Sequence, residues 1–166
     1  TPLRGFGDGS YYEDFFVRKV ADVVADYGFD GYHMVDGYNH GWLQLCHGDY
    51  SDDMIGQFIE NGDVGLPDSV LAPCGRDPDK VTARATWIWQ NRRREWIAFH
   101  ADRWERFFRK VVTAMHAAGK QVACNTCWTR APMEAMYRYG IDYKRIAATG
   151  IDRFIVETCS AGGEML

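Results

Sequence analysis

The chain alternates short apolar segments with longer amphipathic ones, and this alternation constrains the fold more than any other feature. The short segments run from Gly31 to Val35, through "KQVACNTCW" at 120–128 and through "RFIVET" at 153–158. Each is bounded by turn residues and has the length and composition of a buried strand. Strands that alternate with helices predict a parallel sheet with right-handed crossover connections.

The longer segments carry helix start and stop signals. Ser10 followed three residues later by Glu13 predicts a capping box for a helix from about Tyr11 to Tyr27, which Gly28 ends. Ser51 is the expected N-cap of a short helix in "SDDMIGQFIEN". Further helices are predicted at the apolar stripe of Ile97, Trp104, Phe108, Val111 and Met115, which ends near Gly119, and at 132–139 and 142–149.

The spacing of the strand ends favours a barrel. These ends fall near Asp8, Asp36, Asn125 and Glu157, at steps of 28, 89 and 32 residues. Two of the steps match the roughly 30 residues of one βα unit in an eight-stranded barrel. We therefore expect an α/β fold, a partial (β/α)8 TIM barrel of about four βα units, in which residues 1–166 are a single piece of the catalytic domain and 38–90 form an insertion. A doubly wound sheet stays open as the alternative.

Composition narrows the classes of partner. Nineteen basic against twenty-three acidic residues give a formal net charge of −4, which provides no basic footprint for nucleic acid or an anionic membrane. No segment approaches the roughly 20 apolar residues of a membrane span. Five cysteines and the absence of a signal-peptide pattern favour a reducing, cytoplasmic compartment. Because half a barrel leaves strand edges unpaired, we expect the remaining barrel units or a homo-oligomer partner to cover them.

Two carboxylates follow predicted strands. Asp36 ends the strand in "GFDGYHMVDGYNH" and Glu157 ends the strand in "RFIVE". In a barrel the carboxyl ends of the strands form the active site, and glycoside hydrolysis needs two carboxyl groups, one as acid and one as nucleophile or base. The alternative interpretation is that Asp36 caps its loop and Glu157 is a rim charge.

Aromatic and polar side chains at the same rim fit a sugar ligand. Aromatic rings can stack on the apolar side of a pyranose while amide, imidazole and guanidinium groups bind its hydroxyls. The candidate substrate-binding residues are Asp8, Tyr38, Asn39, His40, Trp42, Asn125, Trp128 and Arg130. Trp42 and Trp128 could equally pack the bases of their loops.

A resemblance points the same way. The segments "GFDGYHMVDGYNH", "SDDMIGQFIENGDVGLP", "EWIAFHADRWERFFRKVV", "GKQVACNTCWTRAPMEAMYRYGIDY" and "GIDRFIVET" resemble the middle of large bacterial glycoside hydrolases with a (β/α)8 catalytic barrel. The resemblance implies a nucleophile and an acid/base on different strand ends, in the positions of Asp36 and Glu157, with Asn125 as a substrate contact. No tight acid/base motif follows "VACNTCW", so the resemblance does not assign the two roles.

Two other classes of function remain as alternatives. One is a carbohydrate-binding or scaffold barrel without catalysis. The other is a metal-dependent barrel hydrolase, for which Cys124, Cys127 and Cys159 are the nearest set of ligands. A single C-x-x-C at a strand end does not make a zinc or redox motif, so we expect no metal and no cofactor.

Overall fold

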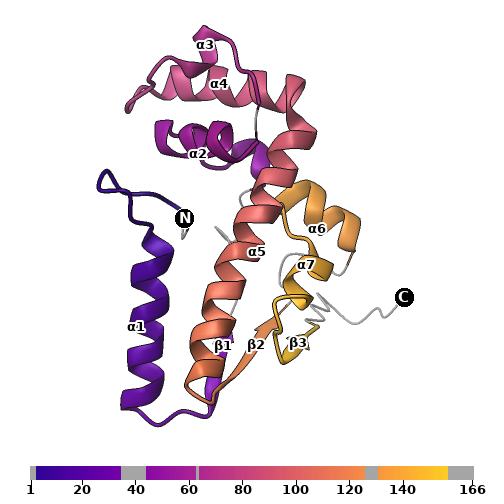
Figure 1. Ribbon diagram of the computed structural model, residues 1–166. Helices are drawn as coiled ribbons and strands as arrows, with labels where there is room; N and C mark the ends of the chain where they lie inside the picture. Colours follow the sequence, from indigo (N-terminus) through magenta and orange to yellow (C-terminus); the bar gives the residue numbers. More distant parts are fainter. Residues whose placement is uncertain (1–2, 35–43, 63, 126–130, 157–166) are drawn as a thin grey trace, which may run out of the picture.

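The computed structural model describes residues 3–34, 44–62, 64–125 and 131–156, which form an α/β fold dominated by helices (Figure 1). The helices are α1 (Tyr12–Asp26), the 3-10 turn η2 (Leu45–His47), α2 (Asp52–Gly62), α3 (Asp68–Leu71), α4 (Pro78–Asn91), α5 (Arg93–Ala117), α6 (Pro132–Tyr139) and α7 (Tyr143–Ala147). The strands are β1 (Gly31–Met34), β2 (Gln121–Asn125) and β3 (Arg153–Ile155).

The three strands form one parallel sheet in the order β1-β2-β3. Strands that follow one another along the chain are therefore neighbours in the sheet. In the register, Met34 pairs with Cys124, and Cys124 pairs with Phe154. The predicted α/β class and the parallel sheet are confirmed for the described residues.

The two faces of the sheet differ in character. Side chains that belong to or pack against the hydrophobic core are those of Tyr32, Met34, Val122, Cys124 and Phe154. Because successive side chains of a strand point to opposite faces, the intervening residues belong to the other face. There, His33, Gln121, Arg153 and Ile155 are exposed. The described helices thus pack against one face, and the other face is exposed at these four positions but buried at Asn125.

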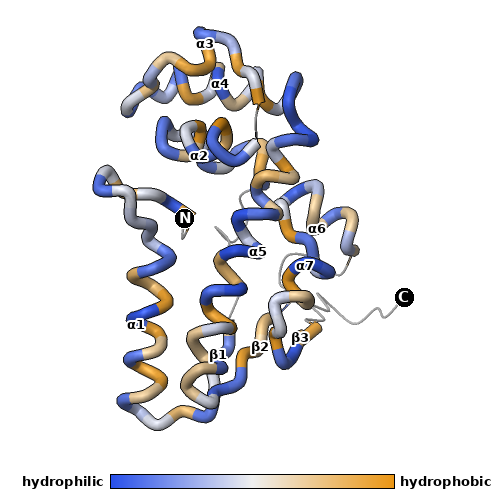
Figure 2. The backbone as a smooth tube through the Cα atoms, viewed as in Figure 1, coloured by the Kyte–Doolittle hydropathy of each residue, from blue (hydrophilic) through white to orange (hydrophobic). Residues whose placement is uncertain are grey.

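Helix α5 is the central element of the structure. It contacts α1, α2, α4, α6, α7 and β2, and it buries a row of large side chains that includes Trp96, Phe107, Phe108 and Met115. Figure 2 shows hydrophobic and hydrophilic positions alternating along α1 and α5, as expected for helices with one buried side. The helix ends before Gly119, whose φ of 69° confirms the predicted glycine stop.

The N-terminal segment departs from two predictions. Residues 3–11 contain no strand, and Gly5 instead forms an isolated antiparallel bridge with Tyr11. The strand predicted to end near Asp8 is therefore wrong, and the described residues contain three strands rather than four. The capping box is also wrong: α1 has Tyr11 as its N-cap without a side-chain cap, and the Ser10 hydroxyl donates to Asp8.

Residues 44–62 and 64–91 form a helical unit beside the N-terminal half of α5. The predicted cap of α2 is confirmed, because the Met54 backbone N–H donates to the Ser51 hydroxyl. Helix α4 was not predicted, although Asp77 caps it by accepting from two backbone N–H groups and Pro78 is its first residue. Helices α4 and α5 are separate, since Arg92 lies between them with φ −137°.

Arg84 holds this helical unit together. Its buried guanidinium donates to the carbonyl oxygens of Val70, Tyr50 and Ala72 and forms an ion pair with Asp52 at 2.9 Å. These bonds join α3, the segment after η2 and the start of α2 to α4. The unit therefore has an internal polar anchor in addition to its apolar contacts.

Candidate functional site

The candidate site lies at the carboxyl edge of the parallel sheet. The strands β1, β2 and β3 end at Met34, Asn125 and Ile155, and the register places Asn125 beside Ile155. Parallel strands present all their carboxyl ends at one edge, which is where α/β proteins place ligands. This edge is thus the part of the described structure in which a ligand site is expected.

Most of the predicted site residues fall outside the described residues. These are Asp36, Glu157, Tyr38, Asn39, His40, Trp42, Trp128 and Arg130. The separation of the two carboxyl groups therefore stays a prediction. Asp8 and Asn125 are the two predicted site residues that the structure describes.

Asn125 has the features of a ligand contact. It is the last residue of β2 and lies on the face opposite Cys124, yet only 6% of its surface is exposed. Its side-chain Oδ1 has no hydrogen-bond partner among the described residues. A buried acceptor without a partner costs roughly 1–3 kcal/mol, which a ligand hydroxyl that donates to it would offset.

Asp8 is placed differently from the prediction. It lies in the loop before α1, where its carboxylate accepts from the Ser10 hydroxyl at 2.6 Å and from the Ser10 backbone N–H at 3.0 Å. The side-chain hydrogen bond, followed by the backbone one, lowers the pKa of Asp8 below its usual value. The observed role of Asp8 is to fold its own loop, and it does not follow a strand.

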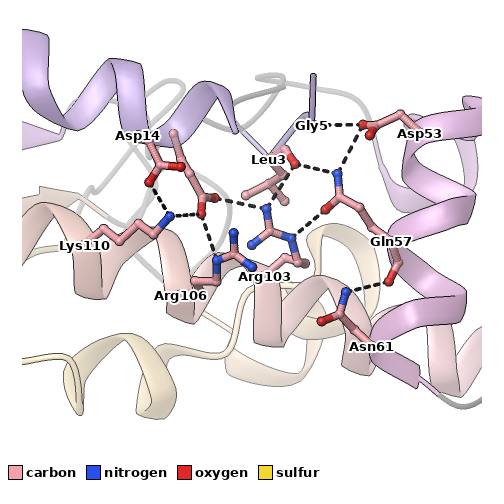
Figure 3. Close-up of polar contacts among 10 residues, drawn as sticks. Leu3, Gly5, Asp14, Asp53, Gln57, Asn61, Arg103, Arg106 and Lys110 are labelled. Carbon is pink, nitrogen blue, oxygen red and sulfur yellow. Dashed lines mark hydrogen bonds and ion pairs between the residues drawn. The ribbon is translucent and has the colours of Figure 1, made fainter. Parts of the chain in front are cut away.

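A buried network of charges joins the N-terminal segment to α1, α2 and α5 (Figure 3). At its centre Glu13 is fully buried and its carboxylate contacts Arg103 at 3.0 Å, Arg106 at 2.9 Å and Lys110 at 2.7 Å. Arg103 also donates to the side chain of Gln57 and to the Leu3 carbonyl. Desolvation lowers the pKa of Arg103, and the charge of Glu13 opposes this effect.

This network is a structural clamp. Both carboxylate oxygens of Glu13 contact basic side chains of α5, so this residue links α1 to α5 and does not face a cleft. Sequence reasoning assigned Glu13 to a local cap because its partners lie about 90 residues away along the chain. In the sequence, Glu13 is a carboxylate near the start of an amphipathic helix. That position suits a helix cap as well as a buried ion pair, so the sequence does not distinguish the two roles.

A buried imidazole lies in the core between α5 and α6. His100 packs edge-on against Trp96 and Phe99, and its Nε2 has no hydrogen-bond partner among the described residues. Burial lowers the pKa of His100 to about 3, so the ring is neutral near pH 7. Aromatic rings enclose the His100 side chain, and it is buried rather than open to a cleft. We therefore interpret His100 as a packing residue and not as a group that transfers protons.

Comparisons with known proteins identify no relative. No protein-family model matches the chain, and neither a curated protein nor a solved structure is significantly similar to it. Within the described ranges, no group of three or more histidine, cysteine, aspartate or glutamate side chains is arranged to hold a metal ion. Over the same ranges, no helix has the length and apolarity needed to cross a bilayer.

Proposed function

We propose that the chain is part of a (β/α)8 glycoside hydrolase whose active site lies at the carboxyl edge of the sheet. The observation that carries the proposal is the sheet itself: three parallel strands in sequential order, with the described helices packed on one face. A doubly wound sheet has helices on both faces and a reversal in strand order. Sequential order with one covered face is instead the arrangement of consecutive barrel units.

The open face of the sheet fits the interior of such a barrel. Its exposed residues include His33, Arg153 and Ile155, the last with 44% of its surface exposed. In a closed barrel this face meets the side chains of the remaining strands. The proposal therefore includes a partner for the sheet, either the remaining barrel units or a second copy of the chain.

The proposed chemistry uses the carboxylate pair predicted from the sequence. Glu157 protonates the leaving glycosidic oxygen while Asp36 attacks the anomeric carbon or activates water, through a transition state with positive charge on the sugar. Asn125 accepts a hydrogen bond from a sugar hydroxyl through its unpartnered Oδ1. Tyr38, Asn39, His40, Trp42, Trp128 and Arg130 complete the proposed sugar-binding rim.

The experiment is a screen of chromogenic glycosides on the full-length polypeptide that contains this chain. Asp36→Asn and Glu157→Gln should each lower kcat at least a hundredfold, because acid, base or nucleophile is lost. Asp30→Asn is the matched control, since Asp30 precedes the opposite end of β1. Its turnover should be unchanged.

Three outcomes contradict the proposal. Glycan binding without any turnover would make the protein a carbohydrate-binding barrel. Loss of activity on exhaustive chelation, with recovery on adding a divalent metal, would favour the metal-dependent hydrolase. Full activity in both carboxylate variants would place the chemistry elsewhere.

A further inference from the structure

A pocket lies between η2 and α4, away from the sheet. Its volume is about 480 Å³, which falls within the 300–1,000 Å³ typical of small-molecule sites. One wall consists of Cys46, His47 and Gly48 at η2, and the other is the exposed side of α4. Nothing in the proposed hydrolase mechanism uses this pocket.

The wall made by α4 has two parallel strips. Val81, Ala85 and Trp89 recur every four residues and form an apolar strip, while Thr82, Thr86 and Gln90 form a polar strip beside it. At 1.5 Å of rise per residue, each strip extends for about 12 Å along the helix. The pocket therefore offers an apolar surface with a hydrogen-bonding border.

The polar strip is suited to ligand hydroxyls. The hydroxyl of Thr82 donates to the Pro78 carbonyl at 2.8 Å, and that of Thr86 donates to the Thr82 carbonyl at 2.9 Å. Since each proton is already used, the oxygens remain as acceptors, and the ligand must supply the donors. The amide of Gln90 can both donate and accept.

The residues that line the pocket suit a neutral ligand better than an ionic one. None of the residues that line the pocket is an aspartate, glutamate, lysine or arginine. A neutral molecule with one apolar face and a border of hydroxyl donors matches such a lining, and a pyranose ring has this construction.

The pocket is also built to keep its shape. Arg84 on α4 donates to the Tyr50 carbonyl at 2.9 Å, which ties the segment after η2 to the helix. The Tyr50 hydroxyl donates in turn to the Leu45 carbonyl. The Arg93 guanidinium lies over the Trp89 ring, 5.2 Å from its centroid, and this cation–π contact restrains the indole. A pre-formed wall lowers the entropic cost of binding.

We propose that this pocket binds a neutral saccharide unit, with Trp89 stacking on the sugar ring and Thr86 and Gln90 binding its hydroxyls. The inference rests on the proposed glycoside hydrolase function and extends it: η2 begins two residues after the 35–43 segment that carries Asp36. The pocket is then an accessory subsite for a part of an oligosaccharide distant from the bond that is cleaved.

The test compares Trp89→Ala with Trp87→Ala in the full-length polypeptide. Trp87 is also a half-buried tryptophan of α4 but does not line the pocket. Trp89→Ala should raise KM for a long oligosaccharide about tenfold, the loss expected for one aromatic stacking contact. KM for a short chromogenic glycoside and kcat should not change, and Trp87→Ala should leave all three values unaltered.

A binding measurement separates this inference from the proposed function. In an Asp36→Asn background, titration with the oligosaccharide should give a calorimetric signal that Trp89→Ala weakens about tenfold and Thr86→Val weakens by a smaller factor. Thr86 is exposed, so Thr86→Val provides the test if Trp89→Ala does not fold. Binding that depends on Trp89 without any hydrolysis by the wild type would leave the subsite standing and the hydrolase proposal overturned. Hydrolysis and binding unchanged in both pocket variants would overturn the subsite alone.

Discussion

Glu13 of α1 and Arg103 of α5 form an ion pair inside the core, with Oε2 and Nη2 3.0 Å apart and both side chains almost fully buried. The pair joins two helices through residues that are 90 positions apart in the chain. Leu3, through its backbone carbonyl, adds the N-terminal segment to the same cluster. Removing one member of such a pair leaves the other charge buried without compensation.

We therefore expect Glu13→Gln to destabilise the fold by about 3–5 kcal/mol. The replacement keeps the size and shape of the side chain and removes only its charge. The control is Asp14→Asn, because Asp14 contacts Lys110 at the exposed surface and such pairs contribute at most about 1 kcal/mol. Urea denaturation measures both free energies of unfolding. Equal effects of the two variants would show that the buried pair is no more important than a surface one.

Two glycines with the same backbone conformation should respond differently to alanine. Gly119 and Gly140 have φ of 69° and 68°, where an L-residue is strained by roughly 1–2 kcal/mol. A Cβ on Gly119 would meet no atom within 4 Å, whereas one on Gly140 would lie 2.6 Å from the Cβ of His100. Gly119→Ala should thus cost only the strain, and Gly140→Ala about 1–3 kcal/mol more because the core must shift.

Thermal unfolding of the two alanine variants checks this difference. Because the conformational strain is common to both, the gap between their midpoints isolates the steric effect at His100. A Gly140→Ala variant as stable as Gly119→Ala would mean that α5 and the end of α6 can separate at no cost.

Local signals in the sequence were reliable where a residue and its partner lie within one turn. Ser51 caps α2, Gly119 follows α5, and α6 has the predicted bounds Pro132–Tyr139. Each depends on backbone conformation or on contacts a few residues apart. The strands β1, β2 and β3 were also predicted, because a short apolar segment between turn residues has few alternatives in a chain of this pattern, whereas the strand expected near Asp8 is absent from residues 3–11.

The incorrect or missed predictions concern residues whose partners are distant in the sequence, or segments whose sequence fits two local structures. The spacing of Ser10 and Glu13 fits a capping box, but the Glu13 carboxylate instead contacts three basic side chains of α5. The apolar periodicity of α5 does not reveal which of its basic residues point inward. Asp77 and Pro78 begin α4, yet the same residues are typical of a turn. The candidate site was predicted from strand ends, and of its residues Asn125 is the one whose placement at the carboxyl edge the described structure confirms.

The contact between the His116 imidazole and the Asp152 carboxylate gives a prediction for acid stability. The side-chain hydrogen bond from His116 at 2.9 Å, followed by the backbone N–H of Val122, lowers the pKa of Asp152 below 3.8. A carboxyl group with a lowered pKa in the folded state stabilises the fold above its unfolded pKa, and this stabilisation is lost as the pH falls through the folded pKa. Asp152→Asn should therefore destabilise the protein at pH 7 and have a smaller effect at pH 3. Urea denaturation at both values measures this, and an effect of Asp152→Asn that is independent of pH would contradict it.

His100 should act in a different pH window. Burial lowers its pKa to about 3, with the charge of Asp49 opposing and that of Arg103 reinforcing the shift, while the unfolded chain retains the value of 6.5. Between these values the unfolded state binds a proton that the folded state does not, so stability must fall as the pH drops below about 6.5, by about 1 kcal/mol per pH unit. His100→Gln removes the titrating group. The free energy of unfolding of the wild type, relative to that of the variant, should therefore fall by about 1 kcal/mol per pH unit from pH 6.5 to pH 4.5. An NMR titration gives the complementary result: the His100 imidazole of the folded protein should show no protonation above pH 5. Protonation near pH 6 would mean that the ring reaches solvent and that the aromatic enclosure formed by Trp96 and Phe99 opens.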